Sequence, residues 1–527
     1  MTRRRRPIST ERFALRTSVL AASLGSIAAA ATSGRAEGAG LVTAAQVQQA
    51  TAQLDALAQT HVDRQAVPGL AIAVVFQDAV VFAEGYGVRV VGRPERVDAD
   101  TVFQLASVSK PVGATVVAAL VGKGKVTWDS SIAALDPGFA MYDPWVTREV
   151  TIRDMYAHRS GLPPHSGDLL EDLGATREQV LHQLRFQRPS TSFRSAYAYT
   201  NFGITAAAVA AARPYALAWE EASEQYLYRP LGMTSTSSCY ADFAARPNHA
   251  LGHVLSDDKW TQKYARDPDA QSPAGGVSSS VNDVARWMRL QLADGVFAGQ
   301  PVVDAKALAE TRRPHILTGF NPFTGMPGFY GLGWNVTYDP QGRLRLNHSG
   351  AFALGAGTHV NLVPGEQLGI VVLTNAAPIG LAEGLATTFM DLALYGSATQ
   401  DWIELFKKRF ADPAAIGVTP GADYSKPPAA RTPPLGNGAY AGSYANAYFG
   451  GIEVVEREGR LAIVQGPKGM MFPMTHYDRD TFTYQPAGEN AAGPSGITFT
   501  IGPDGKATQV VVEHLNARGE GTFARRP

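Results

Sequence analysis

Val102-Phe103-Gln104-Leu105-Ala106-Ser107-Val108-Ser109-Lys110-Pro111 is the stretch from which the fold of this chain is inferred. A short apolar run precedes Ser107, and the apolar segment 111–120 is typical of a buried helix. Pro111 suits the first turn of a helix, where the N–H that proline lacks would have no partner. Residues three or four apart lie on one helix face. The stretch therefore predicts Ser107 and Lys110 side by side at a helix start, with a base in reach of the serine hydroxyl.

Lys110 can act as a base near neutral pH only if its pKa is lowered. Free lysine has a pKa of about 10.4, and a shift of roughly three units corresponds to about 4 kcal/mol. A helix N-terminus disfavours a cation by only about 0.3 to 1 kcal/mol, so burial must supply most of the shift. The Ser-x-x-Lys pattern alone is not specific. Ser256-Asp257-Asp258-Lys259 matches it too, in an acidic, turn-like segment with no apolar helix after it.

The N-terminal segment 1–36 differs in composition from the rest of the chain. Arginines precede a run of small and apolar residues, Ser18 to Ala31, and Gly34-Arg35-Ala36 offers a cleavage site. This order is typical of a secretory signal peptide, and the apolar run is too short for a stable membrane anchor. We therefore predict a periplasmic or secreted protein. The paired arginines leave the export route open.

Composition excludes several classes of protein. Without residues 1–36 the chain has 40 Lys and Arg against 46 Asp and Glu, a net charge of about −6. It lacks the excess of basic residues that is typical of nucleic-acid-binding proteins. Cys239 is the only cysteine, so no intramolecular disulfide can form. We expect no cofactor and no metal, and a small molecule or short peptide as substrate. The oligomeric state stays open.

The 527 residues are too many for one ordinary core, so two or more domains are expected. Strand patterns at both ends of segment 37–411, with helical and loop-rich sequence between them, predict an α/β fold with one sheet built from both ends and an all-helical lobe. We expect a helix over 44–62, a hairpin over 70–76 and 80–86, strands over 333–337, 343–348, 358–363 and 368–373, and a helix over 382–394.

The C-terminal part reads differently. Residues 412–436 are rich in proline and predict a linker. Beyond it, 437–527 carries about eight short strand patterns, with turn signals at Glu458-Gly459 and Asp504-Gly505. These features predict a small closed or nearly closed β-barrel.

Two further groups carry chemistry. In the segment 197–203, Tyr-Ala-Tyr-Thr-Asn-Phe-Gly, a tyrosine can act as a base beside a cation and an asparagine can hold a substrate amide. In His348-Ser349-Gly350-Ala351, at the end of an expected strand, the glycine lets a substrate approach the backbone and the next N–H can face an oxyanion.

Together, Ser-x-x-Lys at 107–110, Tyr-x-Asn at 199–201 and His-Ser-Gly at 348–350 resemble the serine β-lactamase and penicillin-binding-protein superfamily, on its class C side. The order of the three and their spacing of about 90 and then about 150 residues fit that superfamily. The resemblance covers roughly residues 45 to 400 and implies a β-lactamase/transpeptidase-like antiparallel sheet flanked by helices. Segment 437–527 resembles the lipocalin-like domain that follows some of its serine peptidases.

The resemblance also implies roles for individual residues. Ser107 would be the acylated nucleophile, Lys110 its activating partner, and Tyr199 would share the proton transfer. The N–H groups of Ser107 and Ala351 would form the oxyanion hole. The implied substrate-binding residues are Asn201, His348, Gly350 and Ala351.

His348 departs from the lysine that β-lactamases usually carry at this position. A neutral imidazole is a poorer anchor for a carboxylate at pH 7. This favours an esterase, an amidase or a D-amino-acid peptidase, working through an acyl-serine intermediate. The alternatives are a β-lactamase, or a penicillin-binding sensor that acylates with little turnover. A purely structural role in the cell envelope is disfavoured, because Ser107, Lys110 and Tyr199 are all present.

Other candidate sites are weaker. His158 and Ser160 suggest a second catalytic pair, but the superfamily uses this segment structurally. His249 and His253 have the spacing of zinc ligands and lack the glutamate of the metalloprotease motif. The chain contains no Gly-x-Ser-x-Gly, which disfavours an α/β-hydrolase.

Overall fold

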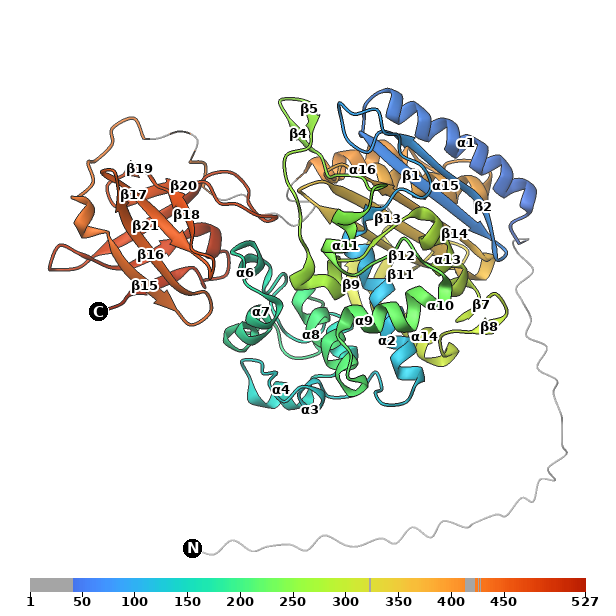
Figure 1. Ribbon diagram of the computed structural model, residues 1–527, viewed down its shortest axis with the longest axis horizontal. Coiled ribbons are helices and arrows are strands. Elements are labelled where there is room, and N and C mark those ends of the chain that lie inside the picture. The colour runs from blue at the N-terminus through green and yellow to red at the C-terminus, as the bar shows by residue number, and fades with distance from the viewer. Residues whose placement is uncertain (1–40, 322–323, 413–421, 425, 427) are drawn as a thin grey trace, which may run out of the picture. The chain divides into compact units, whose positions relative to one another are not determined.

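The computed structural model describes residues 41–321, 324–412, 422–424, 426 and 428–527 (Figure 1). The predicted signal peptide, 1–36, lies outside these residues, as do 413–421 of the predicted linker. Within the described ranges, no helix combines the length and the apolar character that crossing a membrane requires.

An eight-stranded antiparallel sheet forms the centre of the first part of the chain, and its strand order is β2-β1-β14-β13-β12-β11-β10-β9. The N-terminal hairpin therefore joins strands from residues 316–374 through the pairing of β1 with β14, so one sheet is built from both ends, as the sequence predicts. The bounds are β1 Gly69–Phe76, β2 Ala79–Gly87, β9 Ile316–Phe320, β10 Pro327–Tyr330, β11 Asn335–Tyr338, β12 Leu344–Phe352, β13 Ala356–Val363 and β14 Leu368–Thr374.

Helices cover both faces of this sheet, and β1 and β14 are buried along their whole length because of it. Helices α1 and α15 pack on one face, with α16 against α15, and α13 packs on the other. The main helices are α1 Ala44–Asp63, α2 Ser109–Gly122, α3 Ile132–Leu135, α4 Pro144–Glu149, α5 Ile152–Tyr156, α6 Asp168–Asp172, α7 Arg177–Gln183, α8 Asn201–Ala212, α9 Trp219–Ser223, α10 Arg229–Leu231, α11 Tyr240–Ala245, α12 Ser272–Gly275, α13 Val281–Leu292, α14 Ala305–Thr311, α15 Leu381–Tyr395 and α16 Trp402–Ala411.

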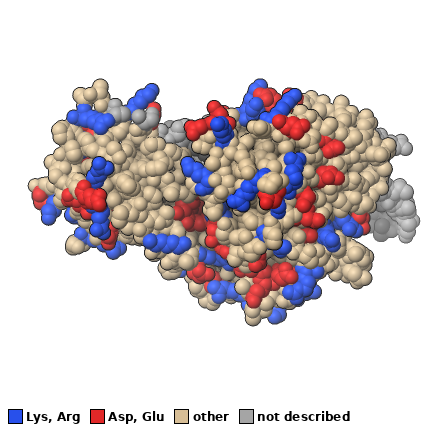
Figure 2. Space-filling model, turned by 45° about the horizontal axis from the view of Figure 1, so that its top comes forward, with Lys and Arg blue, Asp and Glu red and all other residues tan. Residues whose placement is uncertain are grey.

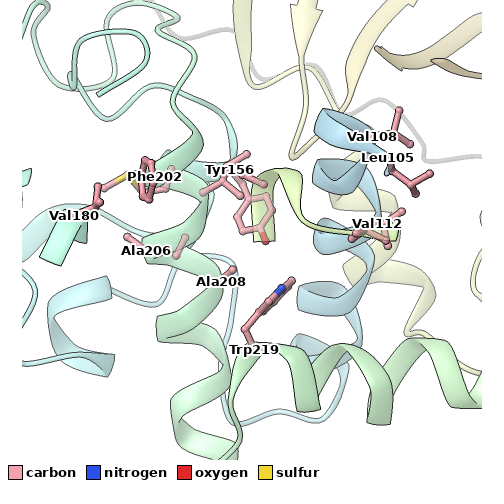
Figure 3. Close-up of a cluster of buried hydrophobic side chains, with 14 of the residues drawn as sticks. Leu105, Val108, Val112, Tyr156, Val180, Phe202, Ala206, Ala208 and Trp219 are labelled. Carbon is pink, nitrogen blue, oxygen red and sulfur yellow. The ribbon is translucent and has the colours of Figure 1, made fainter. Parts of the chain in front are cut away.

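The helical lobe is built around α2 and α8. Helix α8 is rich in alanine, and these small side chains let α2, α5 and α12 approach it closely. Figure 3 shows α2 beside α8, with Tyr156 and Trp219 among the buried side chains of this region. The two helices that begin next to Ser107 and at Asn201 are thus held in one core.

The middle of the chain also contains short strands that the sequence did not reveal. Three two-stranded sheets pair β3 (Phe103–Gln104) with β6 (Ser278–Ser279), β4 (Val254–Ser256) with β5 (Lys259–Thr261), and β7 (Val296–Phe297) with β8 (Gln300–Pro301). In the second of these, Asp257 and Asp258 form the turn, with φ of 49° and 59°. The second Ser-x-x-Lys match is therefore a hairpin, in which Ser256 pairs with Lys259.

The C-terminal part forms a nine-stranded antiparallel sheet in the order β18-β17-β16-β15-β23-β22-β21-β20-β19. It curls into a nearly closed barrel, open between β18 and β19. Aromatic side chains such as Tyr444, Phe499 and Phe523 fill the interior. The strands are β15 Gly442–Asn446, β16 Gly450–Arg457, β17 Arg460–Gln465, β18 Met470–Pro473, β19 Thr475–Asp478, β20 Thr481–Tyr484, β21 Ser495–Ile501, β22 Ala507–Val512 and β23 Thr522–Arg525.

Part of the predicted linker is attached to this barrel. The Thr432 N–H donates to Asp478 at 2.7 Å, and the Tyr424 hydroxyl donates to Glu513 at 2.5 Å. The described end of segment 412–436 therefore lies along the barrel surface. On the face of the molecule shown in Figure 2, basic and acidic side chains are interspersed.

Candidate active site

Ser107 lies in a tight turn directly before α2. Residues Ala106–Val108 form one turn of 3-10 helix and α2 begins at Ser109, so the nucleophile candidate precedes the α-helix by two residues. Ala106 has a φ of 47°, in the left-handed region that costs an alanine about 1 to 2 kcal/mol. The Thr358 hydroxyl on β13 donates to the Leu105 carbonyl at 2.7 Å and helps to hold this turn against the sheet.

Gly350 on β12 is required by the same turn. A Cβ there would lie 2.2 Å from the Leu105 carbonyl oxygen and 3.0 Å from the Ser107 nitrogen. The sequence predicts that this glycine admits a substrate to the backbone. The structure shows that it admits the serine-bearing turn, which brings the Ser107 N–H next to β12.

Lys110 lies completely buried beside Ser107. Its Nζ is 2.9 Å from Ser107 Oγ, 2.7 Å from Asn201 Oδ1 and 2.9 Å from the Ala274 carbonyl oxygen. Burial lowers the pKa of Lys110 to about 7, against an opposing pull from the charge of Asp168. This is the shift that the sequence argument required, and it leaves a large fraction of Lys110 neutral near pH 7.

Tyr199 contacts Ser107 from the other side, and its hydroxyl donates to Ser107 Oγ at 2.7 Å. Burial raises the pKa of Tyr199 well above 10, so it keeps its proton at neutral pH. This direction favours a neutral Tyr199 over a phenolate as the resting form. Lys110 is the group able to accept the proton of Ser107, and Tyr199 is placed to donate one.

Asn201 links Lys110 to α6. While its Oδ1 accepts from Lys110, its Nδ2 donates to Asp168 Oδ2 at 2.9 Å. Because Asn201 is the first residue of α8 and is 9% exposed, its amide is held in one orientation. Its direct partner is the lysine, whereas the sequence predicts a substrate amide.

His348 on β12 is buried and neutral. Its Nδ1 is 2.7 Å from the Ser349 carbonyl oxygen, which can only accept, so Nδ1 carries the proton. Nε2 then accepts from the Tyr330 hydroxyl at 2.9 Å. Burial, helped by the charge of Lys110, lowers the pKa of His348 to about 3. Both ring nitrogens are occupied and the ring has no positive charge with which to bind a carboxylate.

These groups line a pocket of about 360 Å³. Ser107, Tyr199, Asn201, His348 and Ala351 all contribute to its wall, with Lys110 behind Ser107 and Gly350 against its backbone. The structure thus brings together all seven residues that the sequence singles out.

Comparison with known proteins places this geometry in a family. The β-lactamase family model matches residues 54–395, more than half of the chain. The chain belongs to the β-lactamase family. A second model, a domain of unknown function (DUF3471), matches residues 426–523 and so begins inside the predicted linker. The lipocalin-like character of the C-terminal barrel stays a prediction.

Several curated relatives share the β-lactamase part. "Unguisins hydrolase ungD" of Aspergillus violaceofuscus is 26% identical over 83% of this chain and 84% of its own length. "Penicillin-binding protein 4" of Amycolatopsis lactamdurans is 30% identical over 64% of this chain and 85% of its own. "D-alanyl-D-alanine-carboxypeptidase/endopeptidase AmpH" of Escherichia coli is 23% identical over 62% and 83%. These names support a serine hydrolase in general.

A solved structure shares the fold over most of the chain. The octameric penicillin-binding protein homologue from Pyrococcus abyssi covers 90% of this chain and 100% of its own, with a TM-score of 0.59 and 17% identity. At that identity the likeness concerns the fold alone.

The pocket of this β-lactamase family member also contains residues that the sequence did not reveal. Glu489 and Asn490, from the loop between β20 and β21 of the C-terminal barrel, line it beside Asp168. The loop is attached to α6, because the Asp172 carboxylate accepts from the N–H groups of Glu489 and Asn490, each at 2.9 Å. No local pattern marks these residues, since they reach the site only through the tertiary fold.

The pocket is acidic on this side. Asp168 Oδ1 and Glu489 Oε2 are buried and have no hydrogen-bond partner among the described residues. The nearest cation to Glu489 is Arg266, at 3.8 Å, which also pairs with Glu171 at 2.7 Å. Burial raises the pKa of Glu489 to about 7, so its charge depends on pH in the neutral range.

The weaker candidates have structural roles. His158 is buried, accepts from the Thr200 N–H at 3.1 Å and packs against the Tyr199 ring with centroids 4.6 Å apart. His253 accepts at Nε2 from the Val91 N–H at 3.0 Å and its Nδ1 contacts the Asn375 carbonyl at 3.1 Å, so both nitrogens are used. Within the described ranges, no group of three or more His, Cys, Asp or Glu residues is arranged to hold a metal ion.

Proposed function

We propose that this protein is an exported serine hydrolase that cleaves a small amide, peptide or ester bond through an acyl-enzyme on Ser107. The observation that carries the proposal is the pair of contacts at Ser107 Oγ, with Lys110 Nζ at 2.9 Å and the Tyr199 hydroxyl at 2.7 Å. A serine with a neutral amine on one side and a proton donor on the other is equipped for nucleophilic catalysis. Export rests on the signal-like segment 1–36.

The reaction follows from the protonation states. Neutral Lys110 takes the proton of Ser107 as Oγ attacks the carbonyl carbon, and the oxyanion is held by the N–H groups of Ser107 and Ala351. Tyr199 gives its proton to the leaving amine or alkoxide, which leaves a phenolate at Tyr199 and an ammonium at Lys110. In the second half a water molecule attacks the acyl-serine and gives a proton to the Tyr199 phenolate, while Lys110 returns its proton to Ser107 Oγ as that oxygen leaves.

The charges of the pocket favour a substrate with a neutral or cationic group near the scissile bond. His348 is neutral and fully hydrogen-bonded, so it is a poor anchor for the carboxylate of a β-lactam. Asp168 Oδ1 instead has no hydrogen-bond partner among the described residues, and Glu489 Oε2 has only the ion pair with Arg266 at 3.8 Å. A free amine, as in an aminoacyl amide, ester or short peptide, complements them.

The division of the chain belongs to the same proposal. Residues 37–411 form the hydrolase domain, 412–436 connect it to the C-terminal barrel, and 437–527 make up that barrel, from which Glu489 and Asn490 reach the pocket. The family matches at 54–395 and 426–523 support this division, with the second beginning before residue 437.

Labelling with a fluorophosphonate tests the nucleophile. We expect the probe to modify the wild-type protein at Ser107 and the variant Ser107→Ala not at all. Ser256→Ala is a matched control, since Ser256 has the same Ser-x-x-Lys pattern on a hairpin, and it should label like the wild type. Equal labelling of Ser107→Ala would overturn the proposal.

Turnover is tested with the same variants. The wild-type protein should hydrolyse D-aminoacyl amides or esters in steady state faster than a chromogenic cephalosporin. A burst of acylation with no steady state on every substrate would instead identify a sensor that stays acylated.

A further inference from the structure

A second and larger pocket, of about 680 Å³, lies on the other face of the eight-stranded sheet from Ser107. Side chains alternate between the faces of a strand. On β12, His348 and Gly350 therefore face the active site, whereas Arg345, Asn347 and Ser349 line this second pocket. Its other wall comes from α15 and α16, which cover this side of the sheet (Figure 1).

The interface between sheet and helix is unusually polar here. Residues on α15 that line the pocket recur every fourth position, which places them on one helix face. Opposite them, Ser349 is paired with His359 across β12 and β13, with Ser349 Oγ 3.0 Å from His359 Nδ1. An ordinary helix–sheet contact buries apolar side chains, so this polarity requires another explanation. The α15 residues are Glu383, Thr387, Asp391 and Tyr395.

Two arginines, Arg345 and Arg409, line this pocket. Among the described residues the guanidinium of Arg345 forms no hydrogen bond and no ion pair, and the more distant charges of Asp339 and Asp391 act on it. Three carboxylates line the same pocket: Asp339 accepts from Arg343 at 2.6 Å, Asp391 accepts from Trp402 Nε1 at 2.6 Å, and burial raises the pKa of Glu383 to about 7. A guanidinium without a direct partner in a partly buried pocket is available to bind an anion.

A second side chain points to the same ligand. Asn361 on β13 is 5% exposed and lines the pocket, and its side-chain amide has no hydrogen-bond partner among the described residues, so its Nδ2 can donate to a carboxylate oxygen. Arg345, His359 and Asn361 therefore offer a charged fork, an imidazole and an amide on one face of the sheet. A planar carboxylate fits the fork of an arginine in a bidentate way.

The remaining wall indicates that the ligand also has an apolar part. Phe320, Phe329, Tyr338 and Phe406 line the pocket, and its volume lies in the range of sites for organic ligands. We propose that this pocket is a binding site for an organic carboxylate, with the carboxylate on Arg345 and the carbon skeleton against the aromatic wall. The site does not rest on the proposed function, although Asn335 and Ser349 line both pockets.

Isothermal titration of the full-length protein with benzoate and hexanoate, and with benzamide as the uncharged match, tests this site. We expect the two carboxylates to bind and benzamide to bind far more weakly. Arg345→Met should weaken benzoate binding about 10- to 100-fold, the effect of a lost charged hydrogen bond. Arg313→Met removes an exposed arginine outside the pocket and should leave binding unchanged.

Two further measurements distinguish loss of the site from loss of folding. Asn361→Asp adds a negative charge to the pocket and should also weaken benzoate binding, so the test does not depend on whether Arg345→Met folds. Thermal unfolding checks both variants. Protein blocked by a fluorophosphonate at Ser107 should still bind benzoate. Benzoate affinity that is unchanged in both pocket variants, lost on blocking Ser107, or absent in the wild type at millimolar concentration would overturn the proposal.

Discussion

In the proposed reaction, the pKa of Lys110 sets the pH at which Ser107 can react. Only neutral Lys110 can take the serine proton, and its pKa is lowered to about 7 by burial. We therefore expect kcat/KM to rise with pH through an acid limb centred near pH 7. The negative charge of Asp168 stabilises the ammonium form, so Asp168→Asn should lower the pKa further and move the limb to lower pH. Asp129→Asn, an exposed change, should leave it in place. A limb that stays or rises in Asp168→Asn would contradict this role.

For single residues, the sequence predicts those side chains whose residue type and spacing indicate a chemical role. Ser107, Lys110 and Tyr199 belong to that class. The Ala274 carbonyl that contacts Lys110 does not, because every residue has such a group. Nor does Glu489, since one glutamate in a loop of the C-terminal barrel has no local feature that points to Ser107.

At the scale of elements, the approach of the Ser107 turn to β12 depends on Gly350. A Cβ at this position would lie 2.3 Å from Thr358 Oγ1 as well as against the Leu105 carbonyl. We expect Gly350→Ala to destabilise the protein by about 1 to 3 kcal/mol, as overpacking does, and to slow fluorophosphonate labelling. Denaturant unfolding and labelling rates measure the two effects.

Gly451→Ala is the matched control, because a Cβ on this exposed β16 residue meets nothing closer than 3.9 Å. It should change neither property. Labelling of Gly350→Ala at the wild-type rate would show that the Ser107 turn accommodates the added methyl group without losing reactivity.

Elements were predictable where the local signal is strong. The helix over 44–62 appears as α1, and the hairpin over 70–86 as β1 and β2. The turn at Glu458-Gly459 takes φ of 50° and 76°, which suits a tight hairpin. Strands β9 and β10 escaped prediction because they are short, partly exposed and stabilised mainly by their neighbours in the sheet.

At the level of the whole molecule, the C-terminal barrel supplies a titratable side chain, Glu489, to the pocket that contains Ser107. The barrel itself was predictable from its repeated strands and turns. The extension of its loop 485–494 to the pocket of Ser107 was not predictable. It depends on contacts between segments more than 300 residues apart, such as the contact between Asp172 and Asn490. The substrate range of the enzyme should therefore depend on a residue outside the β-lactamase match.

The charge of Glu489 gives this dependence a measurable form. Its pKa is raised to about 7 by burial, so the carboxylate is ionised at pH 8.5 and mostly protonated at pH 5.5. The measured quantity is the ratio of kcat/KM for an aminoacyl p-nitroanilide whose amine is trimethylated, and so stays positively charged at both pH values, to that for its uncharged N-acetyl counterpart. At pH 8.5 Glu489→Gln should lower this ratio roughly five-fold, as about 1 kcal/mol of attraction gives. At pH 5.5 the variant and the wild type should agree. Glu453→Gln, on an exposed part of β16, is the control for a charge change on the barrel. A ratio that is the same for Glu489→Gln and the wild type at both pH values would mean that Glu489 lines the pocket without selecting the substrate.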